Sequence, residues 1–210
     1  MAELNIENLI KSYGSFTVLA FERWALKDGL YWIKGGNGTG KTTLFKVIAG
    51  QTPFDGGVSI NGISLRRNPS LYRSLLSFAE AEPQYPPFIT GNELLDFYCK
   101  VRKTTIKSAD ELIEQFKMGD FMNNKINSYS SGMLKKLSLI CAFTGNTEFY
   151  LLDEPLITID TASAQVLYQC IQRRLKEGAT FMISTHQEME HTAVQVDGVF
   201  EINQQKINAC

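Results

Sequence analysis

The sequence predicts an α/β fold with a mostly parallel core sheet, an antiparallel β subdomain and a helical insertion. Three observations support this prediction. Strand patterns alternate with helix patterns along most of the chain, and a glycine-rich turn at 35–42 joins a strand to a helix. Near residue 80 the strand patterns give way to a proline-containing stretch followed by helix patterns. A chain of 210 residues is long enough for one large domain. We expect a single domain over 1–210, with a helical subdomain at about 80–145.

The expected elements follow in order along the chain. Strands are predicted at 3–10, 17–25, 29–34, within 54–62, and at 75–79, 148–152 and 180–184, with a final hairpin at 196–208. Helices are predicted at 42–49, after Thr90, and at 108–117, 132–143 and 161–176. Thr90 and Glu93 have the spacing of a capping box, whereas the three prolines within 83–87 exclude regular structure there.

Composition limits the classes of partner. The 21 Lys and Arg residues nearly balance the 22 Asp and Glu residues, and no basic stretch marks a nucleic-acid footprint, so no nucleic acid is expected. The cysteines are scattered and predict reduced thiols in a cytosolic protein: Cys99, Cys141, Cys170 and Cys210. No apolar run approaches the roughly eighteen residues of a membrane span, and the N-terminus lacks signal-peptide features. We therefore expect a soluble protein inside the cell.

The glycine-rich turn fits the phosphate-binding loop of P-loop NTPases, G-x-x-x-x-G-K-[ST]. Its residues are Gly35, Gly36, Asn37, Gly38, Thr39, Gly40, Lys41 and Thr42, with Thr43 next in the helix. A strand, a glycine loop and a helix together turn backbone N–H groups toward a polyphosphate. Lys41 would reach the outer phosphates, and the Thr42 hydroxyl would ligate Mg²⁺. An accidental turn is the alternative, but the flanking strand and helix favour a nucleotide site.

Two acids, Asp153 and Glu154, follow the apolar segment 149–152. In a phosphate-loop enzyme an aspartate at this place completes the magnesium shell, so Asp153 is the expected metal ligand. Glu154 is placed to orient or deprotonate a water that attacks the γ-phosphate. The alternative is that both acids merely cap a strand before Pro155. The phosphate loop upstream favours the catalytic interpretation.

A third segment is similar to the signature of one protein family. Residues 129–133, Tyr-Ser-Ser-Gly-Met, resemble the signature of ATP-binding cassette (ABC) transporters, usually Leu-Ser-Gly-Gly-Gln, and the likeness runs from about residue 3 to 205. A serine and a glycine at a helix N-terminus form a second phosphate receptor, which is compatible with Ser130 also acting as an ordinary N-cap. The resemblance implies that Ser130, Ser131 and Gly132 bind the ATP of a second cassette. Two chains, identical or different, would then sandwich two ATP molecules head to tail.

The resemblance assigns three further positions. His186 is similar to the switch histidine that contacts the γ-phosphate, and Asp160 to the aspartate of the loop between two cassettes. Tyr13 resembles the aromatic residue that stacks on adenine, although a half-exposed turn tyrosine is the alternative. His191 is interpreted as a surface residue.

The chain also departs from the family pattern. The family places a glutamine after the strand at 75–79, but Glu80-Ala81-Glu82 stands there and Gln84 comes a few residues late. Glu80 or Glu82 would substitute only at the cost of repulsion near the phosphates, unless magnesium offsets it. The signature has Ser131 and Met133 in place of glycine and glutamine, and 155–160 is more apolar than usual. ATP binding is expected, while these departures leave the turnover rate open.

The resemblance implies a cytoplasmic ATPase subunit of an ABC transporter, with ATP and Mg²⁺ as cofactors. It would dimerise on ATP, hydrolyse it with Lys41, Glu154 and His186, and drive a separate integral membrane permease from the inner face of the cell membrane. The Pro-rich stretch 83–89 is a candidate permease contact or a plain surface loop. The alternatives are a weakly hydrolysing regulatory cassette, or a soluble ABC protein acting on ribosomes or DNA, which the near-neutral charge disfavours.

Overall fold

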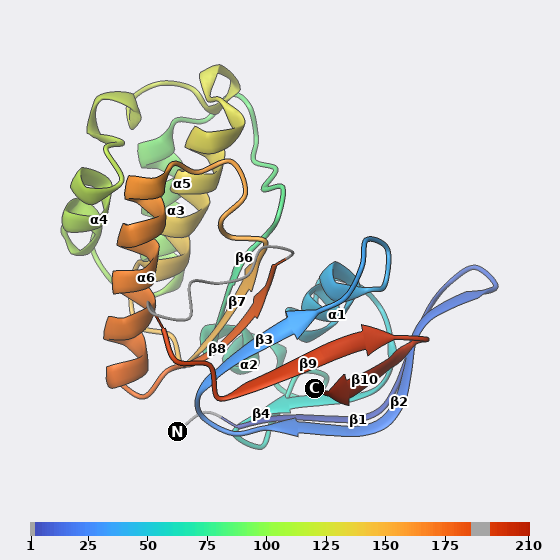
Figure 1. Ribbon diagram of the computed structural model, residues 1–210. Helices are drawn as coiled ribbons and strands as arrows, with labels where there is room; N and C mark the ends of the chain where they lie inside the picture. Colours follow the sequence, from blue (N-terminus) through green and yellow to red (C-terminus); the bar gives the residue numbers. More distant parts are fainter. Residues whose placement is uncertain (1–2, 186–193) are drawn as a thin grey trace.

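Two β-sheets and a group of helices make up the fold in the computed structural model, which describes residues 3–185 and 194–210 (Figure 1). The strands are β1 (Leu4–Tyr13), β2 (Phe16–Leu26), β3 (Leu30–Lys34), β4 (Asp55–Ile60), β5 (Ile63–Ser64), β6 (Leu76–Ala79), β7 (Phe149–Asp153), β8 (Thr180–Ser184), β9 (Gly198–Asn203) and β10 (Lys206–Ala209). The α-helices are α1 (Lys41–Ile48), α2 (Pro69–Ser74), α3 (Gly91–Val101), α4 (Asp110–Gln115), α5 (Ser131–Phe143) and α6 (Thr161–Lys176). Short 3₁₀ helices cover η1 (Ile106–Ala109), η2 (Gly119–Phe121) and η3 (Ile126–Ser128).

The larger sheet is mostly parallel and determines where the site lies. Its strand order is β10-β9-β3-β8-β7-β6, and only the β9–β10 hairpin within it is antiparallel. The carboxyl ends of β3, β8, β7 and β6 therefore meet at one edge of the sheet. The glycine loop follows β3, the acid pair closes β7, and Glu80 follows β6, so three distant segments converge at that edge, as expected for ligand sites in parallel sheets.

The smaller sheet is antiparallel, with the order β2-β1-β4-β5. Buried and exposed residues do not alternate regularly along β1, because Asn8 adopts a positive φ of 49° and the pairing with β4 shifts between Glu7 and Ile10. The two sheets meet where the Ala20 N–H of β2 donates to the Gln205 carbonyl at 2.8 Å. The predicted C-terminal hairpin is thus confirmed, and it lies against the N-terminal strands (Figure 1).

The core has two parts, one on each face of the parallel sheet. Alternate residues of β7 point to opposite faces, so Phe149 and Leu151 pack with α1 and the antiparallel sheet. Tyr150 and Leu152 pack on the other face with α5 and α6. Because both faces are covered, the strand is buried throughout and apolar up to its last residue, Asp153.

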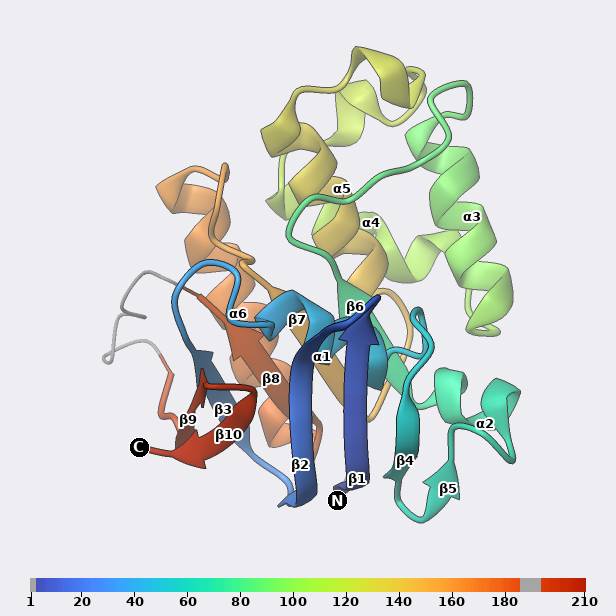
Figure 2. The same ribbon diagram turned by 90° about the vertical axis from the view of Figure 1, so that its right-hand side faces the viewer.

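Helices α3, α4 and α5 gather beyond the sheet edge, as the predicted helical insertion requires (Figures 1 and 2). The capping box is confirmed: the Glu93 N–H donates to Thr90 Oγ1 at 3.1 Å, and the Thr90 N–H donates to Glu93 Oε2 at 2.7 Å. The Arg102 guanidinium closes the far end of α5 by donating to the carbonyls of Cys141, Ala142 and Thr144. This contact ties the end of α3 to the end of α5.

The structure differs from the predicted secondary structure at several short elements. The predicted helix at 108–117 is split into η1 and α4, and the sequence pattern missed α2 and β5, which have only 6 and 2 residues. Such short elements offer too few residues for a period to emerge. Among the helices of 3–185 and 194–210, none is long and apolar enough to cross a membrane.

A candidate nucleotide site at the edge of the parallel sheet

The glycine loop at 35–42 has the backbone shape that its glycines permit. Gly35, Gly38 and Gly40 have φ values of 149°, 77° and 110°, a region that L-residues with side chains rarely adopt. A Cβ on Gly40 would lie 2.9 Å from the Val18 side chain, and one on Gly35 would lie 2.5 Å from Thr39 Oγ1. The glycines therefore allow the loop to close tightly before α1. The N-terminus of this helix provides free N–H groups for an anion.

Lys41 lies across the glycine loop. Its Nζ donates to the carbonyls of Gly35 at 2.7 Å and Gly36 at 3.1 Å, and only 7% of the residue is exposed. Burial lowers the pKa of this ammonium, while the carboxylates of Glu154 and Asp153 act in the opposite direction. The lysine is thus held over the loop, beside the acid pair.

The acid pair is buried, and a serine that the sequence reasoning missed holds it in place. Ser184, the last residue of β8, donates its hydroxyl to Asp153 Oδ1 in a short hydrogen bond. The Glu154 N–H approaches both the carbonyl and the hydroxyl of Ser184 at 3.0 Å, and Glu154 itself has a φ of 45°. Because β7 and β8 are paired with Asp153 opposite Ser184, only the tertiary fold brings this serine to the acids.

The acid pair suits a divalent cation. Asp153 is fully buried, and its Oδ2 accepts no hydrogen bond from any of the described residues. A buried carboxylate oxygen without a partner is costly, and a hard cation that prefers oxygen ligands would satisfy it. The donor set of Asp153 with the Thr42 hydroxyl therefore fits Mg²⁺.

A pocket of about 490 Å³ brings the predicted nucleotide residues together. Its lining comes from the glycine loop, the start of α1, the acid turn and the segment after β6: Val18, Asn37, Gly38, Gly40, Lys41, Thr42, Thr43, Ala81, Glu82, Glu154 and Ile157. Phosphate-binding, acidic and apolar groups thus face one space. The arrangement can hold a polyphosphate on the loop with a carboxylate opposite it.

The segment after β6 places two acids differently. Glu82 lines the pocket together with Ala81, whereas Glu80 accepts a hydrogen bond from Gln51 Nε2 at 3.3 Å. A neighbouring pocket of about 440 Å³ is lined by Glu80, Glu82 and Gln84 together with Thr42. Of the two candidate substitutes for the missing glutamine, only Glu82 also lines the pocket that contains Lys41 and Glu154.

A second residue that the sequence reasoning missed is Lys135 of α5. It is 1% exposed, and its Nζ donates to the Glu80 carbonyl at 2.7 Å and to the Asp153 carbonyl at 3.3 Å. Burial lowers its pKa to about 8, although nearby carboxylates favour the charged form. A lysine in an amphipathic helix ordinarily predicts a solvated side chain, so the sequence offered no signal for this position.

The signature residues lie at the other helix N-terminus, that of α5. Ser130 is the N-cap, and its hydroxyl accepts a hydrogen bond from the Met133 N–H at 3.3 Å. Ser130 and Ser131 are exposed and do not line the pocket of this chain's own glycine loop. A Cβ on Gly132 would lie 2.7 Å from the Thr158 carbonyl, so the helix passes close to the segment after the acids. Binding of a second cassette's ATP by these residues stays a prediction.

Asp160 is the N-cap of α6 and pairs with a lysine of α5. Its Oδ1 accepts from the Ser163 N–H at 2.8 Å, and its Oδ2 lies 2.7 Å from Lys136 Nζ. The Lys136 hydrogen bond, followed by that of Ser163, holds the pKa of this carboxyl far below its ordinary range. The contact joins the start of α6 to the signature helix, beside the face where a partner cassette is predicted.

Tyr13 does not line the pocket. It stands at the end of β1, is 52% exposed, and its ring centroid lies 4.2 Å from Lys11 Nζ. Stacking on adenine therefore stays a prediction. His186 and His191 fall outside the described residues.

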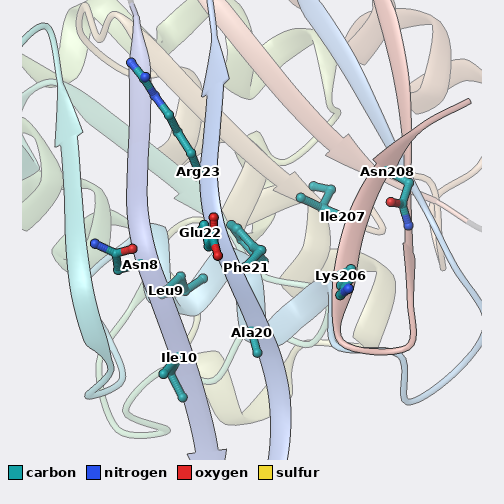
Figure 3. A pocket seen from close by; sticks show the side chains of 10 residues that line it. All are labelled: Asn8, Leu9, Ile10, Ala20, Phe21, Glu22, Arg23, Lys206, Ile207 and Asn208. Carbon is teal, nitrogen blue, oxygen red and sulfur yellow. The ribbon is translucent and has the colours of Figure 1, made fainter.

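A separate pocket of about 610 Å³ lies between the two sheets' edges (Figure 3). Its side chains come from β1, β2 and the β9–β10 hairpin: Asn8, Leu9, Ile10, Ala20, Phe21, Glu22, Arg23, Lys206, Ile207 and Asn208. None of them belongs to the glycine loop or the acid pair. The predicted phosphate-loop and catalytic residues thus line the pocket that contains Lys41, at the carboxyl edge of the parallel sheet.

Comparison with known proteins settles the family. A family model described as ABC transporter matches residues 24–157, more than half of the chain. The chain belongs to the ABC transporter family. The recognition from residues 129–133 and the predicted fold class are thereby confirmed, as is the assignment of an ATP-binding P-loop protein.

Individual relatives agree with the family. The linearmycin resistance ATP-binding protein LnrL of Bacillus subtilis is 27% identical over 207 residues, covering 96% of this chain and 66% of that protein. The ABC-type transporter ATP-binding protein EcsA of the same organism is 27% identical over 192 residues, covering 89% and 78%. A solved ATP-binding subunit of an ABC transporter superposes with a TM-score of 0.89 over 98% of this chain and 89% of its own, at 22% identity, which supports the fold alone. The chain thus spans just under two thirds of LnrL.

Proposed function

We propose that this ABC protein hydrolyses ATP and uses the energy to drive a separate membrane permease. The observation that carries the proposal is the convergence of Lys41, Thr42 and Glu154 on one pocket, with Asp153 buried behind them. Two segments far apart in the sequence supply the three kinds of group that phosphoryl transfer requires: a phosphate loop at 35–42, and a metal ligand and a carboxylate at Asp153 and Glu154. A pocket that only stored nucleotide would need no carboxylate at that position.

Each residue has a distinct role in the proposed reaction. N–H groups of the loop and the α1 N-terminus bind the phosphates, and Lys41 neutralises charge on the outer phosphate oxygens. Thr42 and Asp153 would hold Mg²⁺, which supplies charge neutralisation at the bridging oxygens when bound. Glu154 orients and deprotonates the attacking water, and the Ser184 contacts hold its backbone in place. His186 is proposed to contact the γ-phosphate.

The signature residues imply a second cassette. Ser130, Ser131 and Gly132 lie at a helix N-terminus that does not face this chain's own pocket. Each chain therefore offers a phosphate loop and a separate phosphate receptor, and two chains in head-to-tail arrangement complete two sites. We infer that ATP is the bridging ligand in a homodimer or a heterodimer of cassettes.

A surface on the helical side suits the membrane partner. Phe97 and Val101 of α3 are 60% and 61% exposed, although both are apolar, and they line a pocket of about 450 Å³ that also includes Phe78. Phe88, in the Pro-rich stretch 83–89, is 70% exposed as well. We propose that a cytoplasmic segment of the permease covers this apolar surface and holds the protein at the inner face of the membrane.

The decisive experiment compares the unmodified protein with Glu154→Gln. The unmodified protein should hydrolyse MgATP, and the variant should lose at least about a hundredfold in turnover because it lacks a general base. The variant should still form ATP-dependent dimers, seen by size-exclusion chromatography with MgATP. Tagged variant protein incubated with MgATP and detergent-solubilised native membranes should recover a polytopic membrane protein.

Two results would contradict the proposal. Absence of turnover, even with the recovered permease present, would favour a regulatory cassette, as the altered segment at Glu80–Glu82 motivates. Recovery of ribosomal or DNA-associated proteins without a membrane protein would favour a soluble ABC protein.

A further inference from the structure

Lys135 is a buried cation that the proposed reaction does not use. Its side chain starts in α5 and reaches the edge of the parallel sheet, where it is 1% exposed. Burying an ammonium is unfavourable unless hydrogen bonds and opposite charges offset the loss of water. Its hydrogen-bond acceptors are the Glu80 carbonyl at 2.7 Å and the Asp153 carbonyl at 3.3 Å. Both acceptors belong to the segments that line or support the nucleotide pocket.

The two carbonyls mark the point where the sheet ends. Strands β6 and β7 pair in parallel up to Ala79 opposite Leu152, so Glu80 and Asp153 are the next residues along each strand. Beyond them one chain enters the segment 80–90, and the other turns sharply through Glu154 with its φ of 45°. The ammonium therefore bridges the two chains where their own pairing stops.

The surroundings of Lys135 are strongly acidic. The carboxylates of Asp153, Glu154, Glu82 and Glu80 all act on its charge. Two of these acids stand in the segment where the family pattern has a glutamine, and they add negative charge beside a phosphate site. A buried cation between the two segments offsets that repulsion without occupying the pocket.

We propose that Lys135 is a positioning residue for ATP hydrolysis, which clamps the acid turn at Asp153–Glu154 to the segment after β6 and offsets the repulsion among their carboxylates. Lys135 lies four residues after Ser131 in α5, one helical turn from the signature end. The same side chain thus connects the receptor for a partner's nucleotide with the acids of its own site. This inference rests on the proposed ATP hydrolysis.

The test compares Lys135→Met, Lys135→Arg and the control Ser138→Ala. Methionine keeps the unbranched stem but removes the charge, arginine keeps the charge and the donors, and Ser138 is a buried polar residue of α5 whose hydroxyl bonds Tyr85. We expect Lys135→Met to lower kcat for MgATP at least about tenfold while KM changes by less than about threefold, because the phosphate loop is untouched. Lys135→Arg should stay within about fivefold of the unmodified kcat, and Ser138→Ala should leave it unchanged.

Amide hydrogen exchange tests the role of Lys135 without a measurement of turnover. In the nucleotide-free protein, Lys135→Met should speed amide exchange in 80–83 and 153–158, whereas Ser138→Ala should leave both segments protected. Unchanged exchange there, or an unchanged kcat in Lys135→Met, would overturn the inference. Equal loss in the methionine and arginine variants would overturn it too, because the charge would then be irrelevant.

The two proposals fail in distinguishable ways. If the unmodified protein does not hydrolyse ATP, the proposed function fails, and the exchange comparison still decides whether Lys135 clamps the two segments. If the unmodified protein is active and Lys135→Met matches it, only the role of Lys135 fails.

Discussion

The N-termini of α1 and α5 are two phosphate receptors of the same physical kind in different surroundings. At α1, a glycine loop, the buried Lys41 and the buried Glu154 line a pocket of about 490 Å³. At α5, Ser130 and Ser131 are exposed and do not line that pocket. A helix N-terminus alone attracts an anion weakly, whereas enclosure and added charge make the attraction strong.

The difference fits the proposed mechanism. In that mechanism the α1 end supplies the groups for binding and chemistry within one chain, and the α5 end is completed by a second cassette. Lys135 joins the two, because it starts in α5 and ends at the acids beside α1.

Removal of the Lys41 charge at the start of α1 should have the largest effect on turnover of MgATP. Lys41→Ala should lower kcat/KM for MgATP by about a hundredfold to a thousandfold, the usual cost of losing a charged donor to a transition state. Steady-state kinetics and nucleotide binding by calorimetry measure it. Lys100→Ala, which changes a lysine on the exposed surface of α3, is the control and should leave both values unchanged. A Lys41 variant with full activity would show that the α1 end is not the catalytic half.

A negative charge introduced at the start of α5 should lower turnover without harming the helix. Ser131→Glu places a negative charge at a helix N-terminus, which the helix tolerates well, but it repels an incoming phosphate. We expect at least about a tenfold loss of turnover, and the neutral control Ser131→Gln should lose less. Thermal unfolding should show that both variants keep their stability.

Mixing variants tests whether the two ends act across a dimer. Glu154→Gln and Ser131→Glu should each be nearly inactive, but a mixed dimer contains one site with an intact acid from one chain and an intact signature from the other. Equimolar mixing should therefore raise turnover well above that of either variant. If mixed dimers form and stay inactive, the α5 end does not serve the partner's nucleotide.

The hydrogen bond from the Ser184 hydroxyl to Asp153 should contribute moderately to stability. Ser184→Ala removes the hydroxyl that bonds buried Asp153, so we expect the free energy of unfolding to fall by about 1–3 kcal/mol, with a loss of turnover. Chemical denaturation and MgATP turnover measure the two effects. Ser77→Ala, in strand β6 on the other side of β7, removes a buried hydroxyl that bonds the Ala142 carbonyl and Arg102, and it should lower stability without lowering turnover. Equal turnover in both variants would contradict the role of Ser184.

The smallest effect is expected at Asp160. Asp160→Asn keeps a good N-cap but removes the ion pair with Lys136, which is partly exposed, so the free energy of unfolding should fall by at most about 1 kcal/mol. The pKa of this carboxyl is depressed in the folded state, so its contribution is present above the unfolded pKa near 4 and is lost as the pH falls further. The difference in unfolding free energy between the unmodified protein and Asp160→Asn should therefore shrink progressively as the pH is lowered below about 4. A difference that stays constant as the pH falls from 7 toward 2 would exclude the ion pair as its cause.

Local patterns accounted for much of the fold. The glycine loop, the capping box at Thr90 and the apolar strand before Asp153 are encoded in consecutive residues, because turn chemistry, helix capping and strand alternation act over a few positions. The signature-like residues 129–133, together with the glycine loop and the acid pair, then led to the family. The short α2 and β5 were missed because 6 and 2 residues carry no readable period.

Consecutive residues indicated which side chains could bind phosphate and metal, and in which order the strands and helices come. The folded molecule shows which groups support them: Ser184 beside Asp153, Glu82 in the pocket with the glycine loop, and Lys135 between two strand ends. The Ser184–Asp153 and Lys135–Glu80 hydrogen bonds join residues 31 and 55 positions apart. Pairing of β7 with β8 brings the first two residues together, and packing of α5 beside β6 brings the second two together. The physical reason is that burial turns an ordinary serine or lysine into a specific partner, and burial is a property of the assembled sheet and helices, not of neighbouring residues.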